Sequence, residues 1–137
     1  MPIKMTQKRA INILIWIVGA ILLLHVAIVT KVIPYEIAWG GKLKSDTQMY
    51  LFESISILVT LLLGIILLIK GNYVPLFIPI SIVNALLWVF FVLFGLNTAG
   101  NLLAETLFEK SLSVLTLCIT FLIWKICKGN KPSSTKV

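Results

Sequence analysis

One histidine and two glutamates lie within or at the edge of long apolar stretches of this sequence: His25, Glu53 and Glu109. An ionisable side chain inside a membrane costs about 2.5–3.5 kcal/mol on insertion scales, so each such residue is a candidate for function. An imidazole beside carboxylates can form a structural polar cluster, bind a ligand or take part in proton-coupled movement. Which of these applies depends on whether three separate segments bring the side chains together.

The composition excludes an ordinary soluble domain. The 137 residues are 59% hydrophobic and 12% charged, with a mean hydropathy of +1.04, whereas soluble domains are about half apolar and a quarter charged. The 12 Lys and Arg residues fall between the apolar runs, which excludes the continuous basic patch of a nucleic-acid binder. Two cysteines are too few for a disulfide scaffold. The composition therefore indicates an integral membrane protein. Its expected partner is the lipid bilayer, and nucleic acid is not an expected partner.

Four apolar segments are each long enough to cross a hydrocarbon core, which needs about 20 residues of helix. Backbone groups find no partners in lipid, and these runs do not alternate as barrel strands would, so the segments must be helices. The sequence predicts an all-α fold, an antiparallel up-down four-helix bundle forming a single transmembrane domain over residues 1–137. The predicted spans are about 10–33, 47–69, 74–96 and 102–126, followed by a mobile tail at 128–137.

The charges predict the orientation of the bundle. If the amino terminus is cytoplasmic, eight cations fall on the cytoplasmic side, and four cations with all five acids fall outside. Cytoplasmic loops of membrane proteins carry the excess of Lys and Arg. We expect a multi-pass protein of the plasma (inner) membrane with both termini in the cytoplasm, and the high ratio of Lys to Arg suggests a bacterial source.

The helical rise predicts the depth of the three titratable residues. His25, Glu53 and Glu109 each lie about 24–25 Å from the cation near the cytoplasmic end of their own span, at about 1.5 Å per residue. Ser, Thr and Gly at helical spacing define inward-facing stripes on the second and fourth spans, and small residues are typical of helix contacts in membranes. The sequence therefore predicts that the imidazole and both carboxylates meet one or two turns below the outer surface.

Three further residues complete the predicted ligand site. Trp39 lies in the long first connection, and Trp88 and Asn84 lie on the third span. Asn84, expected near the bilayer midplane, needs a polar partner there: either a hydroxyl across the bundle, from Thr60 or Thr116, or a ligand beside Trp88. With the titratable residues they would frame an outward-facing pocket for a small molecule or a lipid headgroup.

Catalysis and cofactor binding have little support in the sequence. A histidine and two glutamates match a zinc ligand count, but no metal-binding spacing accompanies His25, and no turn motif exposes a nucleophile. We predict no metal, no cofactor and no catalytic residue, and an enzyme is less expected than a binding protein. The alternatives that remain open are an oligomeric small transporter or channel, formed as a homo-oligomer, and an accessory subunit without a site. In length and four-span layout the chain resembles small multidrug-resistance transporters and small fluoride channels.

Overall fold

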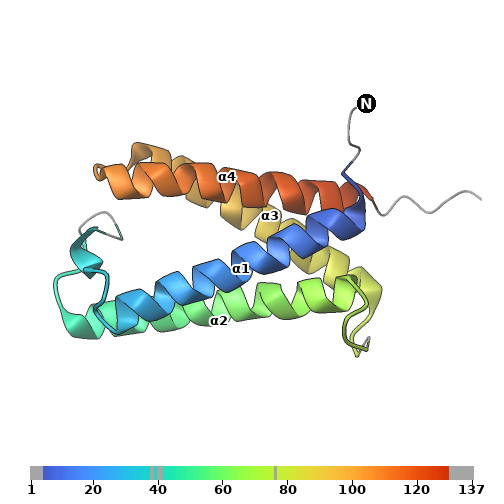
Figure 1. Ribbon diagram of the computed structural model, residues 1–137, viewed down its shortest axis with the longest axis horizontal. Coiled ribbons are helices and arrows are strands. Elements are labelled where there is room, and N and C mark those ends of the chain that lie inside the picture. The colour runs from blue at the N-terminus through green and yellow to red at the C-terminus, as the bar shows by residue number, and fades with distance from the viewer. Residues whose placement is uncertain (1–4, 38, 40–41, 76, 130–137) are drawn as a thin grey trace, which may run out of the picture.

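The computed structural model describes residues 5–37, 39, 42–75 and 77–129. Its four long helices are α1 (Gln7–Val29), α2 (Asp46–Lys70), α3 (Ile80–Leu103) and α4 (Leu107–Lys128), and a short 3-10 helix, η1 (Tyr35–Ile37), follows α1 (Figure 1). All four long helices have the length and apolar character needed to cross a membrane. The prediction of an all-helical, multi-pass membrane protein is confirmed. From residue 130 onward the predicted mobile tail lies outside the described residues.

Hydroxyl side chains cap the amino ends of three of the four long helices. Thr6, Ser45 and Thr106 occupy the N-cap positions of α1, α2 and α4, and each hydroxyl accepts a hydrogen bond from a backbone N–H three residues later, at 3.2 Å. Such caps satisfy backbone donors that have no partner within the helix. The spacing from Ser45 to Gln48 is that of a capping box. The Gln48 side chain, however, accepts from the N–H of Lys44 at 2.9 Å, one residue before the cap.

The third helix is displaced from its predicted span at both ends. It begins at Ile80 and ends at Leu103, whereas the apolar run predicted about 74–96. Pro75 and Pro79 explain the late start, because proline lacks the N–H that a helix needs and disfavours helical geometry at the residue before it. Gly100, which follows the predicted end at about residue 96, lies within the helix, since one glycine costs a helix only about 1 kcal/mol.

The first and fourth helices also differ from their predicted bounds. The first ends at Val29 instead of about residue 33, because the chain turns at Lys31, which has a left-handed φ of 62°. The Lys31 ammonium forms an ion pair with Asp46, which joins the end of α1 to the start of α2. The fourth begins at Leu107, five residues later than predicted, where Thr106 supplies its cap.

The helices pack as two pairs. Contacts are most extensive between α3 and α4 and between α1 and α2, and less extensive between α1 and α4 and between α2 and α3. The amino end of α1 and the carboxyl end of α4 lie together at one end of the bundle, here called the terminal end, and the opposite end, beside η1, is called the loop end (Figure 1). At the terminal end Gln7 Nε2 donates to the carbonyl of Ile126 at 2.8 Å. Toward the loop end the two pairs diverge.

Candidate functional site

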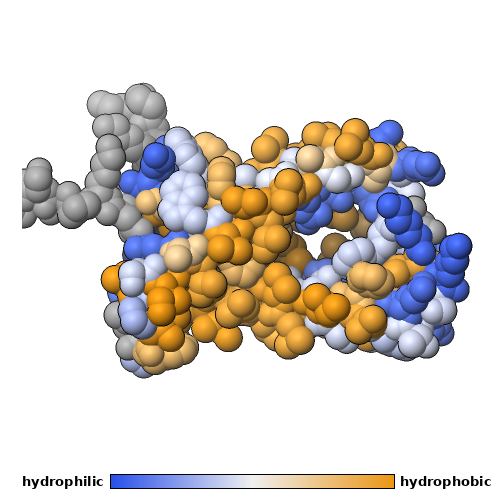
Figure 2. Space-filling view, turned by 180° about the vertical axis from the view of Figure 1, so that it is seen from behind, coloured by the Kyte–Doolittle hydropathy of each residue, from blue (hydrophilic) through white to orange (hydrophobic). Residues whose placement is uncertain are grey.

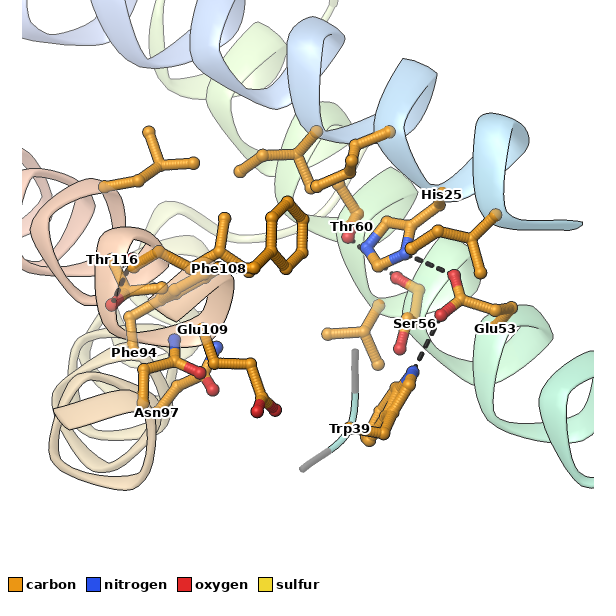
Figure 3. A pocket seen from close by; sticks show the side chains of 17 residues that line it. His25, Trp39, Glu53, Ser56, Thr60, Phe94, Asn97, Phe108, Glu109 and Thr116 are labelled. Carbon is orange, nitrogen blue, oxygen red and sulfur yellow. Dashed lines mark hydrogen bonds and ion pairs between the residues drawn. The ribbon is translucent and has the colours of Figure 1, made fainter. Parts of the chain in front are cut away.

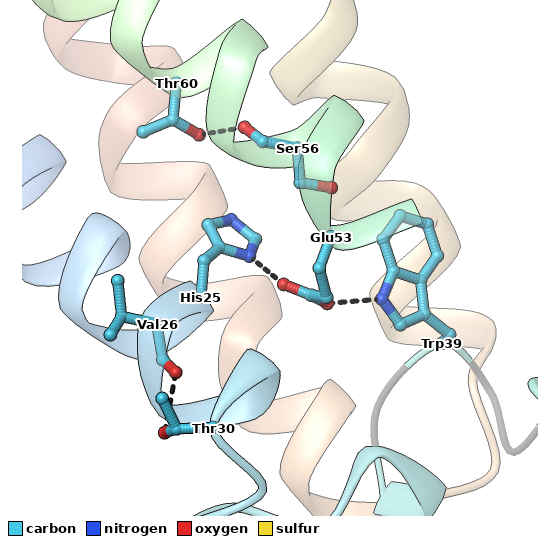
Figure 4. Close-up of polar contacts among 7 residues, drawn as sticks. All are labelled: His25, Val26, Thr30, Trp39, Glu53, Ser56 and Thr60. Carbon is cyan, nitrogen blue, oxygen red and sulfur yellow. Dashed lines mark hydrogen bonds and ion pairs between the residues drawn. The ribbon is translucent and has the colours of Figure 1, made fainter. Parts of the chain in front are cut away.

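Three side chains from three elements form a hydrogen-bonded network at the loop end. The Nδ1 atom of His25, on α1, lies 2.6 Å from Oε2 of Glu53, on α2. The indole Nε1 of Trp39 donates to the other oxygen of the same carboxylate, Oε1, at 2.8 Å (Figure 4). The Glu53 side chain is 0% exposed and that of His25 is 17% exposed. Both carboxylate oxygens are therefore satisfied, which a buried carboxylate requires.

The role of the imidazole depends on the protonation state of Glu53. When the carboxylate is ionised it only accepts hydrogen bonds, and the proton between Glu53 and His25 then sits on Nδ1. In a neutral imidazole, Nε2 is then a hydrogen-bond acceptor, and in a protonated one it is a second donor. The network can thus present either an acceptor or a donor at Nε2.

The backbone of Trp39 is strained in the position that the network requires. Its φ of 56° lies in the left-handed region, where a bulky residue is a genuine outlier. Such strain persists only where surrounding contacts hold it, and it concentrates at functional sites. Three contacts hold Trp39: the hydrogen bond of its indole to Glu53, packing against the Phe52 ring, whose centroid is 5.1 Å from that of the indole, and a hydrogen bond from the backbone N–H of Lys42 to the Trp39 carbonyl at 3.2 Å.

The network forms part of the wall of a cavity between the two helix pairs. The cavity has a volume of about 250 Å³, and the space-filling view shows the opening between the pairs toward the loop end (Figure 2). Apolar side chains from all four helices contribute much of its wall. Its polar lining consists of His25, Trp39, Glu53, Ser56, Thr60, Asn97, Asn101, Glu109 and Thr116.

Glu109 lines the same cavity from the opposite helix pair (Figure 3). It is 6% exposed, and its Oε2 accepts a hydrogen bond from the Thr106 hydroxyl at 2.8 Å. Thr106 and Glu109 thus form the N-cap and third position of a capping arrangement at the start of α4. The structure joins His25 to Glu53 directly, and it brings Glu109 to the same cavity with a different partner.

Two predicted site residues lie elsewhere. Trp88 is 42% exposed and packs edge-on against Phe91, outside the cavity lining. Asn84 accepts a hydrogen bond from Lys70 Nζ at 2.6 Å, instead of contacting Thr60 or Thr116. The late start of α3 explains this difference, because it places Asn84 in the first turns of the helix, near the terminal end.

The lining residues that were not predicted include Phe94, Asn97 and Asn101 on α3, and Phe108 on α4. The predicted spans leave residues 97–101 as a connection, although Phe94, Asn97 and Asn101 fall at i, i+3 and i+7, the spacing of one helical face. Extending the third helix to Leu103 would have placed both asparagines on the wall that faces Glu53.

Most hydroxyls of the small-residue stripes bond to their own helices. Thr60 donates to the carbonyl of Ser56 at 2.7 Å, and Thr120 donates to the carbonyl of Thr116 at 2.8 Å. The hydroxyls of Thr98 and Thr116 form a buried contact between α3 and α4 at 2.9 Å. These residues therefore serve helix packing first, and Ser56, Thr60 and Thr116 also line the cavity.

The chemistry available at the cavity is that of two carboxylates, an imidazole, an indole and two amides within apolar walls. Among the residues that the structure describes, no three His, Cys, Asp or Glu side chains lie close enough together to hold a metal ion. The cavity is suited to hydrogen-bonding and electrostatic binding of a ligand that also has apolar surface.

No protein-family model matches this chain, and neither curated proteins nor solved structures show significant similarity to it.

Proposed function

We propose that this small multi-pass membrane protein binds a small molecule or a lipid headgroup in the cavity at its loop end. The observation that supports this most strongly is the state of Glu53, a fully buried carboxylate held by Trp39 and His25 at the wall of a cavity. A buried charge is costly unless it is paired, and the backbone strain at Trp39 adds to the cost. Unfavourable features of this kind concentrate at functional sites, which supports a binding role for the cavity.

The packing of the terminal half favours a pocket with one open end over a transporter or channel. Between the cavity and the terminal end, buried apolar side chains from all four helices form one continuous cluster. It includes Leu14, Leu63, Leu87 and Ile123, each 0% exposed. A conducting path needs polar or hydrated lining along its length. An apolar cluster of this kind closes the bundle toward the terminal end.

We infer that the termini are cytoplasmic and that the loop end faces outside. Among the described residues, the cations near the terminal end are Lys8, Arg9, Lys70, Lys125 and Lys128, and those toward the loop end are Lys31, Lys42, Lys44 and Lys110, together with all five acids. The larger number of Lys and Arg residues at the terminal end is in line with the positive-inside tendency. A cysteine-free variant carrying either Lys44→Cys or Met5→Cys tests it: an impermeant maleimide added to intact cells should label only the first. Labelling of only the Met5→Cys variant would show that the protein has the opposite orientation in the membrane.

Native mass spectrometry tests the binding function. The protein is extracted from cell membranes in mild detergent, and the mass of any retained small molecule or lipid is measured. Ser56→Leu should displace the ligand by filling the cavity without removing the Glu53 network. Ser54→Leu is the matched control, because Ser54 is exposed and lies outside the lining. A ligand retained near one per chain by the wild type and Ser54→Leu, and lost from Ser56→Leu, supports binding; equal spectra for all three contradict it.

A further inference from the structure

We propose that the occupant of the cavity is an amphiphile with a protonated amine, which enters sideways from the bilayer. The proposal rests on the binding function above and adds the chemical class of the ligand and its route. Three features of the cavity carry it: its charge, its aromatic and amide lining, and the direction of its opening.

The charge of the lining favours a cation. Two carboxylates, Glu53 and Glu109, face one imidazole, and no Lys or Arg occurs among the residues that line the described cavity. When both glutamates are ionised, the lining has a net negative charge whether His25 is neutral or protonated. Charges interact more strongly in a low-dielectric site than in water. An ammonium group is therefore attracted to this cavity, and a phosphate or carboxylate is repelled.

The remaining polar and aromatic groups also suit an ammonium. An ammonium carries three donors and no acceptor. The side-chain oxygens of Asn97 and Glu109 are acceptors on the wall opposite Glu53 (Figure 3), and Asn101 also lines the cavity. The rings of Trp39 and Phe94 line the same space. Cations bind favourably over aromatic faces, most of all where water is excluded.

The direction of the opening indicates that the ligand has a long apolar part. Figure 2 looks across the helix axes, as from within a bilayer, and the cavity is visible from this side between the two helix pairs. Apolar side chains that include Ile21, Leu24, Leu112 and Leu115 also line the cavity, deeper in the bundle than His25 and Glu109. A volume of about 250 Å³ holds a headgroup and the first part of a chain. The rest of the chain can leave through the opening into lipid.

Binding of three probes with the same chain length tests the ligand class. The whole protein is placed in nanodiscs of phosphatidylcholine and titrated with dodecylamine, dodecanol and sodium dodecanoate, and binding is followed by thermal melting. Dodecylamine should raise the melting temperature in a saturable way, and the alcohol and the carboxylate should bind at least about tenfold more weakly, as expected when a charge-assisted hydrogen bond is lost. Equal affinity for dodecanol and dodecylamine would overturn the proposal.

Glu109→Gln isolates the charge, because glutamine keeps a side-chain acceptor for the capping contact with Thr106. It should weaken dodecylamine binding by about tenfold. Glu105→Gln is the matched control: Glu105 is exposed, lies close to Glu109 in the sequence and does not line the cavity, so its affinity should be that of the wild type. An unchanged affinity in Glu109→Gln would also overturn the proposal.

A second arm separates a lipid headgroup from a free amine. Nanodiscs containing phosphatidylethanolamine, whose headgroup carries a primary amine, are compared by native mass spectrometry with phosphatidylcholine nanodiscs. Retention of phosphatidylethanolamine that Ser56→Leu abolishes identifies a lipid; dodecylamine binding without it identifies a free amine, and both support the proposal. If dodecanoate binds instead and Ser56→Leu abolishes it, the amine class is wrong and the binding function stands. If none of the probes binds, both fail.

Discussion

The imidazole Nδ1 of His25 lies 2.6 Å from the carboxylate Oε2 of Glu53, and this contact joins α1 to α2 at the loop end of the bundle. Trp39 completes the coordination of the carboxylate from the connection that follows α1. One buried acidic group therefore fixes the relative positions of two helices and a loop. The same group forms part of the wall of a cavity whose lining is both polar and apolar.

His25→Ala should destabilise the protein by about 2–3 kcal/mol, because it removes a hydrogen bond to a buried charged group. Glu53→Gln should destabilise it by a similar amount. In the double variant the two effects should fall short of additive by about 1–3 kcal/mol, as is typical of residues in direct contact. Unfolding by SDS titration in mixed micelles measures all three. Strictly additive effects would show that the two side chains do not interact.

Trp39→Phe should cost about 1–3 kcal/mol, because one oxygen of the buried Glu53 carboxylate loses its donor. The phenyl ring retains the packing against Phe52, so the loss reports on the N–H group. Trp88→Phe is the control, since Trp88 is 42% exposed and outside the cavity. Its effect should stay within about 0.5 kcal/mol. Similar losses in both variants would contradict a specific role for the Trp39 indole.

Gly71→Ala should destabilise the connection between α2 and α3. A Cβ at Gly71 would lie 2.8 Å from two ring atoms of Tyr73 and 3.2 Å from a methyl of Ile11. The ring is restrained, because the Tyr73 hydroxyl donates to Asn12. We expect a loss of about 1–3 kcal/mol, the usual range for overpacking.

Gly100→Ala is the matched comparison for Gly71→Ala. Gly100 lies inside α3, and a Cβ there would have no neighbour within 4 Å. Alanine is favoured over glycine in a helix interior, so this variant should be more stable by about 0.5–1 kcal/mol. Thermal melting in detergent should shift in opposite directions for the two alanine variants. A shift in the same direction would contradict the packing around Gly71.

Lys31→Gln should cause a small fall in the melting temperature at neutral pH that vanishes in alkali. The hydrogen bond from Lys31 to Asp46 raises the pKa of the ammonium above its usual value. A group with a raised folded pKa stabilises the folded state below its unfolded pKa, and loses this effect as the pH rises through the raised value. The difference between wild type and variant should also shrink at high salt, since both partners are exposed. A difference in melting temperature that is independent of pH and salt would contradict a stabilising ion pair between Lys31 and Asp46.

The sequence predicts the fold well because hydrophobic length alone identifies spanning helices. The four apolar runs are visible directly in the sequence, and polar residues such as Ser45 mark helix starts by their type. The helix ends are harder to predict from hydrophobic length: the apolar run begins at Val74, but Pro75 and Pro79 within it delay the start of α3. That displacement moves Asn84 toward the terminal end and Asn97 into the cavity wall.

The site was predictable where depth along the helix decides the contact. His25 and Glu53 were expected at one level, and they form a hydrogen bond. Depth does not specify the direction of a side chain around its helix or the partner it selects. Glu109 reaches the same cavity but bonds Thr106, the cap of its own helix, because the local N-cap geometry offers it a donor. The strained φ of Trp39 has no signal in the sequence.

A crystal structure of the protein grown in lipidic mesophase would test the central claim most directly. We predict continuous density in the cavity between Glu53 and Glu109, with a nitrogen within hydrogen-bonding distance of the Glu109 carboxylate and a chain leaving between the helix pairs. A cavity that holds only water, or one closed by the packing of the two pairs against each other, would contradict the account.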